Sequence, residues 1–180
     1  DAHGVKMLSV GQLVNAGTAL AWRGPMVSSA LGQLMDGDWG DCDVMIVDLP
    51  PGTGDIQISL LQQWKPAGAV IVSTPQDLAL IDASRAIDLF RKMGVPVVGL
   101  VENMAGYACP RCGEVSDPFG SGGAEDKARS LSIPFLGRVP LTLSIREACD
   151  AGTPPAAGEG PEAEIFASIA AKLFDQVNRL

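Results

Sequence analysis

Short hydrophobic runs alternate along this chain with segments whose apolar residues recur at helical spacing. The runs at residues 43–48 and 68–73 are apolar on both faces, which is typical of strands buried inside a parallel sheet. Alternating strands and helices predict an α/β fold, a mostly parallel sheet flanked by helices and joined by right-handed crossovers. The expected strands are residues 5–10, 43–48, 68–73, 97–101 and 133–139.

The predicted helices are placed by apolar spacing and by their end signals. In the helix that begins at Asp77, the pattern predicts an inner face, and Gly94 marks its end. Residues 103–123 are expected to be an irregular loop, and a linker rich in glycine and proline precedes the last helix. The predicted inner face comprises Leu78, Ile81, Ile87, Phe90 and Met93. The expected helices are residues 25–35, 56–63, 77–93, 124–131, 144–150 and 161–178.

Length and charge narrow the range of functions. The chain has 180 residues, enough for one sizeable core, so a single domain over residues 1–180 is the expectation. Thirteen Lys and Arg against 21 Asp and Glu give a net charge of −8, which argues against a nucleic-acid partner. No apolar run approaches the roughly 18 residues that a membrane span needs, so no membrane partner is expected. Four cysteines are too few for a disulfide scaffold, which favours a reducing compartment.

An aspartate at the end of an apolar run is the first candidate for chemistry. Asp48 follows residues 43–47 and leads into a turn rich in proline and glycine, residues 49–55. A carboxylate there can hold Mg²⁺ through water, and glycine leaves backbone N–H groups open to a terminal phosphate. The alternative is an ordinary strand-to-helix turn in which Thr53 or Asp55 caps the next helix.

The phosphate-binding loop that should accompany such an aspartate is not found. The motif G-x-x-x-x-G-K-[ST] needs a glycine directly before a lysine, and no lysine here follows a glycine. The glycine-rich residues 120–123 lead into the acidic pair Glu125 and Asp126, the wrong charge for phosphate. Either the chain is no nucleotide enzyme, or the loop lies upstream of Asp1.

A CxxC pair is the second candidate site. Cys109 and Cys112 suit zinc, an iron–sulfur cluster or a redox dithiol. The polar loop that follows counts against the redox alternative, while Cys42 and Cys149 are expected to be bystanders. Because one chain supplies two thiolates and a [4Fe–4S] cluster takes four, two chains could share a cluster; a zinc site shared between subunits competes with this.

Together these segments resemble the Mrp/ApbC family of iron–sulfur cluster carrier ATPases, deviant-Walker P-loop proteins of SIMIBI type related to the MinD/ParA group. The resemblance covers nearly the whole chain, and plain MinD or ParA proteins lack the CxxC. It rests on Trp22-Arg23-Gly24-Pro25-Met26, Val47-Asp48-Leu49-Pro50-Pro51-Gly52-Thr53-Gly54-Asp55, Thr74-Pro75-Gln76-Asp77, Val101-Glu102-Asn103-Met104, Cys109-Pro110-Arg111-Cys112-Gly113-Glu114 and Phe135-Leu136-Gly137-Arg138-Val139-Pro140.

The resemblance implies ATP-dependent carriage of a [4Fe–4S] cluster that bridges a homodimer, and its delivery to apo iron–sulfur proteins. It assigns Asp48 to Mg²⁺ and catalysis, Pro51, Gly52 and Thr53 to sensing the terminal phosphate, and Asn103 to adenine. Cys109 and Cys112 would be the cluster ligands. The implied location is the cytoplasm, or the mitochondrial matrix if the source is eukaryotic.

One departure from the family is large. The family's lysine-bearing loop and the strand and helix around it should precede position 1, so the expected P-loop NTPase domain is incomplete. We expect these 180 residues alone not to hydrolyse ATP, whereas the full protein would. Two alternatives remain: a zinc-binding, non-catalytic dimer module, and a MinD/ParA-like positioning ATPase. The last helix lacks the basic face that a membrane-directed positioning ATPase would use.

Overall fold

The computed structural model of the protein describes residues 2–12, 24–50 and 54–180. These residues form two compact units, Asp1–Lys65 and Pro66–Leu180. The second unit contains the sheet and both cysteines of the CxxC pair, and the first contains Asp48.

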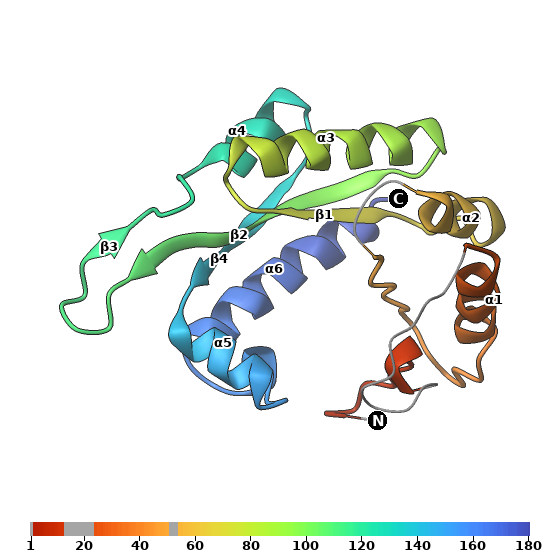
Figure 1. Ribbon diagram of the computed structural model, residues 1–180, viewed down its shortest axis with the longest axis horizontal. Helices are drawn as coiled ribbons and strands as arrows, with labels where there is room; N and C mark the ends of the chain where they lie inside the picture. Colours follow the sequence, from red (N-terminus) through yellow and green to blue (C-terminus); the bar gives the residue numbers. More distant parts are fainter. Residues whose placement is uncertain (1, 13–23, 51–53) are drawn as a thin grey trace. The chain divides into compact units, whose positions relative to one another are not determined.

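The second unit is built on a four-stranded sheet with β2 at its centre (Figure 1). β1 and β4 both run parallel to β2, one on each side, and the short β3 pairs with the far end of β2 in the antiparallel sense. Tyr107 of β2 pairs with Ser116 on one side and with Leu141 on the other, so β3 occupies the side of β1 beyond its end. The predicted mostly parallel α/β sheet is therefore confirmed. The strands are β1 (Ala69–Ser73), β2 (Val97–Ala108), β3 (Val115–Ser116) and β4 (Phe135–Leu141).

Helices cover both faces of this sheet (Figure 1). α3 and α4 lie over one face, and α5 and α6 lie over the other. On the α6 side, Val101, Leu136 and Val139 form a buried cluster against which Ile165, Phe166, Ile169 and Leu173 pack. Predicted and observed helices agree to within a few residues at each end. The helices are α3 (Asp77–Lys92), α4 (Gly123–Ser130), α5 (Leu143–Asp150), the 3₁₀ turn η2 (Pro155–Ala157) and α6 (Pro161–Val177).

The buried face of α3 differs from the prediction. Ile87 and Phe90 are buried as expected, but Leu78 is 79% exposed and Ile81 is 48% exposed. Leu80 and Ala83 take the inner positions instead. Both sets of residues recur at helical spacing, so periodicity alone cannot decide which of them faces the sheet.

The first unit contains two helices in the predicted places. Near the end of α1, the indole N–H of Trp39 donates to the carbonyls of Leu34 and Met35, at 3.2 and 3.3 Å. These bonds satisfy carbonyls that have no partner inside the helix. The elements are η1 (Val10–Gln12), α1 (Gly24–Met35) and α2 (Asp55–Gln63).

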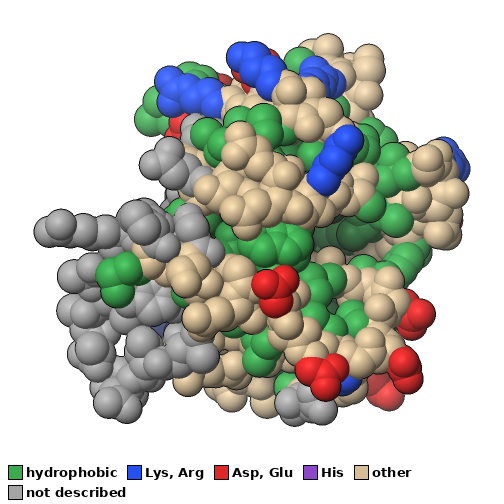
Figure 2. All heavy atoms as spheres, turned by 90° about the vertical axis from the view of Figure 1, so that its right-hand side faces the viewer, with side chains coloured by type: hydrophobic (Ala, Val, Ile, Leu, Met, Phe, Trp, Pro, Cys, Tyr) green, Lys and Arg blue, Asp and Glu red, His purple; other side chains and the backbone are tan. Residues whose placement is uncertain are grey.

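The two strands predicted in this unit do not form in the described residues. Residues 43–48 are irregular, and Ile46 is 84% exposed. Residues 5–10 contribute only one isolated bridge, between Ala2 and Val5, before η1 begins. A strand inside a parallel sheet is held by hydrogen bonds to neighbours on both sides, and an apolar run does not by itself supply those neighbours. Hydrophobic side chains, drawn in green, are also exposed at the surface of the face shown in Figure 2.

The prediction of an irregular loop over residues 103–123 is wrong in its first half. β2 continues through Ala108, and β3 pairs back onto it. The register between β2 and β4 shifts between Asn103 and Tyr107, where Met104 and Gly106 have positive φ angles of 58° and 73°. Beyond this bulge β2 extends past the helical layers, and β2 and β3 together form a projecting arm (Figure 1). We call residues 103–122 the arm.

Candidate functional site: a thiol pair at the tip of the arm

The CxxC pair lies in the turn that joins β2 to β3. The backbone N–H of Gly113 donates to the carbonyl of Cys109 at 2.8 Å, and the N–H of Cys109 donates to the carbonyl of Glu114 at 2.9 Å. Gly113 has a φ of 74°, a conformation that glycine adopts without strain. This closed turn holds the two thiols near enough to each other for a side-chain hydrogen bond between them. Cys109 is half-buried and Cys112 is exposed.

The turn favours the ionised form of one thiol. The pKa of Cys109 is lowered, chiefly because the backbone N–H of Arg111 donates to its sulfur. The backbone N–H and the neighbouring thiol of Cys112 lower this pKa further, and slight burial opposes them. Since the thiolate is the form that binds metals, the turn prepares Cys109 as a ligand. Hydrogen bonds to sulfur also tune iron–sulfur clusters.

The CxxC pair supplies two of the four ligands that a tetrahedral zinc site or a [4Fe–4S] cluster needs. All four cysteines of the chain are free thiols. Within residues 2–12, 24–50 and 54–180, no group of three or more His, Cys, Asp or Glu side chains comes together in a metal-binding arrangement. A four-ligand metal or cluster held at Cys109 and Cys112 would therefore draw its other ligands from elsewhere.

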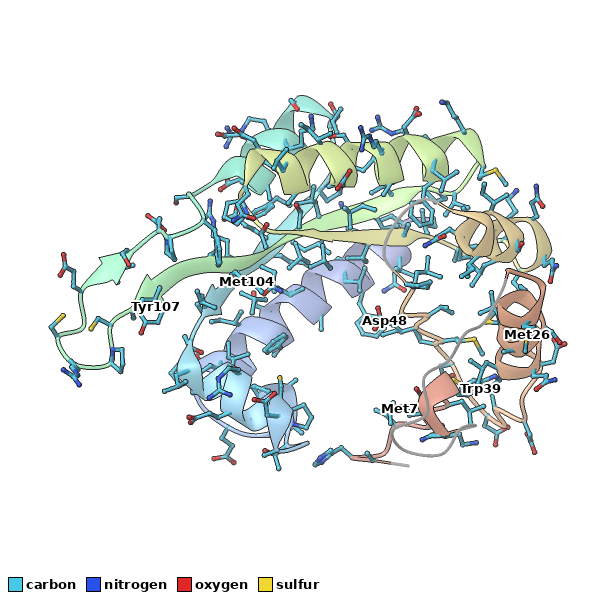
Figure 3. All side chains as sticks on the ribbon, in the orientation of Figure 1. Met7, Met26, Trp39, Asp48, Met104 and Tyr107 are labelled. Carbon is cyan, nitrogen blue, oxygen red and sulfur yellow. The ribbon has the colours of Figure 1, made fainter. Side chains whose placement is uncertain are left out.

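Asn103 lies on β2 directly after Glu102, the last residue that pairs with β1, and in folds of this type ligands bind beyond the carboxyl ends of strands. It is half-buried on β2, opposite Val139 of β4. Its side-chain carbonyl accepts a hydrogen bond of 2.9 Å from the N–H of Met104, which fixes the orientation of the amide and leaves its NH₂ group as a donor. Met104 and Tyr107 follow along the same strand toward the thiol pair (Figure 3).

Asp48 belongs to the first unit, where its side chain is exposed (Figure 3). The following turn is held from one side by Gln57 of α2. The amide of Gln57 donates to the carbonyl of Pro50 at 2.7 Å and accepts from the N–H of Gly54 at 3.0 Å. Gln57 is only 4% exposed, and it tethers both ends of the turn. Pro51, Gly52 and Thr53, the other residues predicted here, lie outside the described residues.

The sequence prediction missed Gln57. The available signal is its position three residues after Gly54, the place where a glutamine side chain can reach back to the first residue of a helix. The structure also places Glu102 and Arg138, two residues of the quoted motifs without an assigned role, in contact with each other.

The glycine-rich residues 120–123 have a packing role. A β-carbon on Gly123 would lie 2.5 Å from the carbonyl oxygen of Pro75 and 2.9 Å from Leu80. Gly122 has a φ of 75° at the N-terminus of α4. The chain therefore needs glycine here to bring α4 close to the loop after β1.

The mostly parallel sheet with helices on both faces defines an α/β protein that carries a thiol pair on an arm. Residues 1–174 match a family model described as ParA, NUBPL iron-transfer P-loop NTPase. The chain therefore belongs to this family of P-loop NTPases, which confirms the class that the sequence motifs predicted.

Similar proteins extend this assignment. A mitochondrial iron–sulfur protein required for NADH dehydrogenase from Arabidopsis thaliana is 54% identical over 155 residues, covering 86% of this chain and 50% of its own length. An iron–sulfur cluster carrier protein from Deinococcus radiodurans is 49% identical over 181 residues, covering 99% of this chain and 51% of its own length. The chain thus spans about half the length of these relatives.

A solved structure shows the same fold. A nucleotide-binding protein from Archaeoglobus fulgidus in complex with ADP superposes with a TM-score of 0.65 and 36% identity, over 76% of this chain and 56% of that chain. In the described part of this chain, no helix has the length and apolar character needed to cross a membrane.

Proposed function

We propose that the protein containing this sequence is an iron–sulfur cluster carrier whose cargo is a [4Fe–4S] cluster held between two copies of the chain. The observation that carries this proposal is the turn at the tip of the arm, which closes by backbone hydrogen bonds, holds the thiols of Cys109 and Cys112 next to each other and lowers the pKa of Cys109. Two copies supply the four thiolates that such a cluster takes. Exposure at the end of an arm suits a cargo that must be handed on.

The names of the relatives favour one of the metals that this donor set could bind. Thiolates select zinc as well as iron–sulfur clusters, so the chemistry of Cys109 and Cys112 leaves both open. The printed names of the Arabidopsis and Deinococcus relatives refer to iron–sulfur chemistry. These names favour the cluster over a zinc-bridged dimer module, and apo iron–sulfur proteins are the corresponding recipients.

ATP is the proposed second substrate. Asp48 would hold Mg²⁺ through water, Pro51, Gly52 and Thr53 would sense the terminal phosphate, and the NH₂ group of Asn103 would donate to adenine. Membership of the P-loop NTPase family supports this part, as does the ADP bound to the Archaeoglobus protein. We place the protein in the cytoplasm or, by analogy with the name of the Arabidopsis relative, in the mitochondrial matrix.

Anaerobic reconstitution with iron and sulfide tests the proposal on the full-length gene product. We expect brown, oxygen-sensitive protein with four irons per two chains, eluting as a dimer. Cys109→Ser and Cys112→Ser should each abolish the colour, and the matched control Cys149→Ser, which removes an exposed thiol outside the arm, should retain it.

Metal analysis of the same samples distinguishes the alternatives. Stoichiometric zinc with no uptake of a cluster would identify the zinc-bridged dimer module instead. A cluster that persists in both the Cys109→Ser and Cys112→Ser variants would show that the arm does not carry it.

A further inference from the structure

Glu102 is a fully buried carboxylate to which the proposed function gives no role. Its exposed fraction is 0%, yet both of its oxygens have partners. Oε1 accepts from Nε of Arg138 at 2.9 Å, and Oε2 accepts from the backbone N–H of Ala124 at 2.9 Å. A buried ion pair contributes little net stability compared with an apolar replacement of the same shape. The role of Glu102 is therefore better inferred from where its two partners lie than from the stability that the ion pair contributes.

Glu102 and Ala124 lie on opposite sides of the base of the arm, the outgoing and the returning side. The chain enters the arm directly after Glu102 and returns to the body of the unit at α4, where Ala124 is completely buried. The hydrogen bond between them joins residues 22 positions apart and closes the base. Arg138 of β4 reinforces this closure, because its guanidinium also contacts Glu125 on the returning side.

Arg138 is held in place to make both contacts. Its guanidinium lies 5.4 Å from the ring centre of Phe135, within the range of a cation–π interaction. Partial burial opposes its charged form, but the hydrogen bond to Glu102 and the charges of Glu102 and Glu125 prevail and raise the pKa of Arg138. It therefore stays charged at every physiological pH. We call Glu102, Arg138 and Glu125 the clasp.

The returning side of the arm depends on such a closure. The outgoing side is paired with β4 as far as Tyr107 and Leu141. The returning side pairs with β2 at only two positions, Val115 and Ser116, and residues 117, 118, 120 and 121 are exposed. A two-stranded ribbon is marginally stable by itself, so the anchoring of its base governs where its tip points.

We propose that the clasp positions the arm, with Glu102 and Arg138 acting as positioning residues that present Cys109 and Cys112 in a fixed direction. The consequence for the cargo rests on the proposed function: four thiolates from two copies can meet one cluster only if each pair arrives in a defined orientation. The clasp contacts the chain at the base of the arm and would act on the thiols through the backbone of the arm.

Hydrogen exchange on the full-length, cluster-free protein tests the positioning directly. Glu102→Gln keeps the shape of the side chain but loses its charge and one of its acceptors. Because a hydrogen bond to a charged group is lost, the hydrogen-bonded amides within 117–124, those of Gly120 and Ala124, should exchange about tenfold faster. Asp82→Asn is the matched control, since it removes an exposed ion pair to Arg85 on α3 and should leave these amides unchanged.

Glu125→Gln keeps the test valid if Glu102→Gln does not fold. Glu125 is partly exposed, so this variant loosens the clasp without leaving a buried group unpaired. It should accelerate exchange in the same amides by a smaller factor, with exchange in β1 and α6 unchanged. Acceleration spread evenly over the whole second unit, or none at 117–124, would overturn the proposal.

Cluster retention separates this proposal from the proposed function. After reconstitution, both clasp variants should lose their cluster to an iron chelator several-fold faster than the wild type and the Asp82→Asn control. Unchanged loss rates in variants with a loosened arm would overturn the link between clasp and cargo. If the wild type takes up no cluster while the clasp variants still loosen the arm selectively, the positioning role stands and the proposed function fails.

Discussion

The side chain of Leu136 occupies the space next to Gly99 where a β-carbon would otherwise lie. A second bulge between β2 and β4, separate from the one at the base of the arm, falls at this point, since Leu100 pairs with Phe135 and Val101 with Gly137, which leaves Leu136 as the extra residue. Leu136 is only 1% exposed and belongs to the cluster beneath α6. The absence of a side chain at residue 99 is therefore a packing requirement of the sheet that supports the arm.

Gly99→Ala should lower the free energy of unfolding by about 1–3 kcal/mol, because the added methyl group overpacks the core against Leu136. Gly158→Ala is the matched control, since its new β-carbon would meet only the carbonyl of Pro155 at 3.5 Å. Urea denaturation of both variants measures the difference. Adding Leu136→Ala to Gly99→Ala should recover part of the loss relative to the sum of the single effects, and strict additivity would contradict this contact.

The thiol of Cys109 should ionise at a lower pH than an ordinary cysteine. The lowered pKa means that the rate of alkylation of Cys109 by iodoacetamide reaches its midpoint at a lower pH in the folded, metal-free protein than in the same protein unfolded in urea. Mass spectrometry of the modified peptide measures the rate at each pH. Arg111→Ala should leave the folded midpoint in place, because the backbone N–H of residue 111 is the main cause. A midpoint that rises with this substitution would assign the effect to the guanidinium instead.

The 180 residues described by this sequence should not hydrolyse ATP at a meaningful rate when purified alone. They contain no lysine in a phosphate-binding loop, and that lysine neutralises the phosphate charge in P-loop enzymes. Release of phosphate from ATP by these 180 residues and by the full-length gene product gives the comparison. Hydrolysis by the 180 residues that disappears with Asp48→Ala would contradict the prediction.

Ser144 and Glu162 link α5 to α6, and this link should make stability depend on pH. The Ser144 hydroxyl donates to Glu162 at 2.8 Å, and this bond, followed by one to the backbone of Glu162, lowers the pKa of that carboxyl. A carboxyl whose pKa is lower in the folded state stabilises the fold above its unfolded pKa, and this contribution is lost as the pH falls through the folded value.

Ser144→Ala should therefore raise the pKa of Glu162 toward its ordinary value and reduce stability at neutral pH. The difference in melting temperature between wild type and Ser144→Ala should narrow in acid, where Glu162 is protonated in both. Carboxyl titration by NMR and thermal melts across the acidic range measure the two effects. A difference that stays constant with pH would show that Ser144 acts only through its hydrogen bond to Thr142.

Much of the second unit could be read from local sequence. The end of α3 shortly before Gly94 follows from the preference for glycine after a helix, and the start of α6 at Pro161 follows from the preference for proline in a first turn. The CxxC spacing locates the thiol pair without any structure. The adenine contact assigned to Asn103 stays a prediction; the structure places this residue on β2, directly after Glu102, the last residue that pairs with β1. The projection of the arm was not predictable, since β2 was expected to end at residue 101 and continues to Ala108.

The sequence by itself determined the alternation of strands and helices in the second unit, the family, and the cysteines able to act as ligands. These depend on periodicity, spacing and turn residues, which are properties of short segments. Tertiary structure decided that Leu80 rather than Leu78 faces the sheet, that residues 43–48 form no strand in the described chain, and that Glu102 meets both Arg138 and Ala124. Each of these depends on a partner distant in sequence, and a local pattern does not specify which distant groups will fold against it.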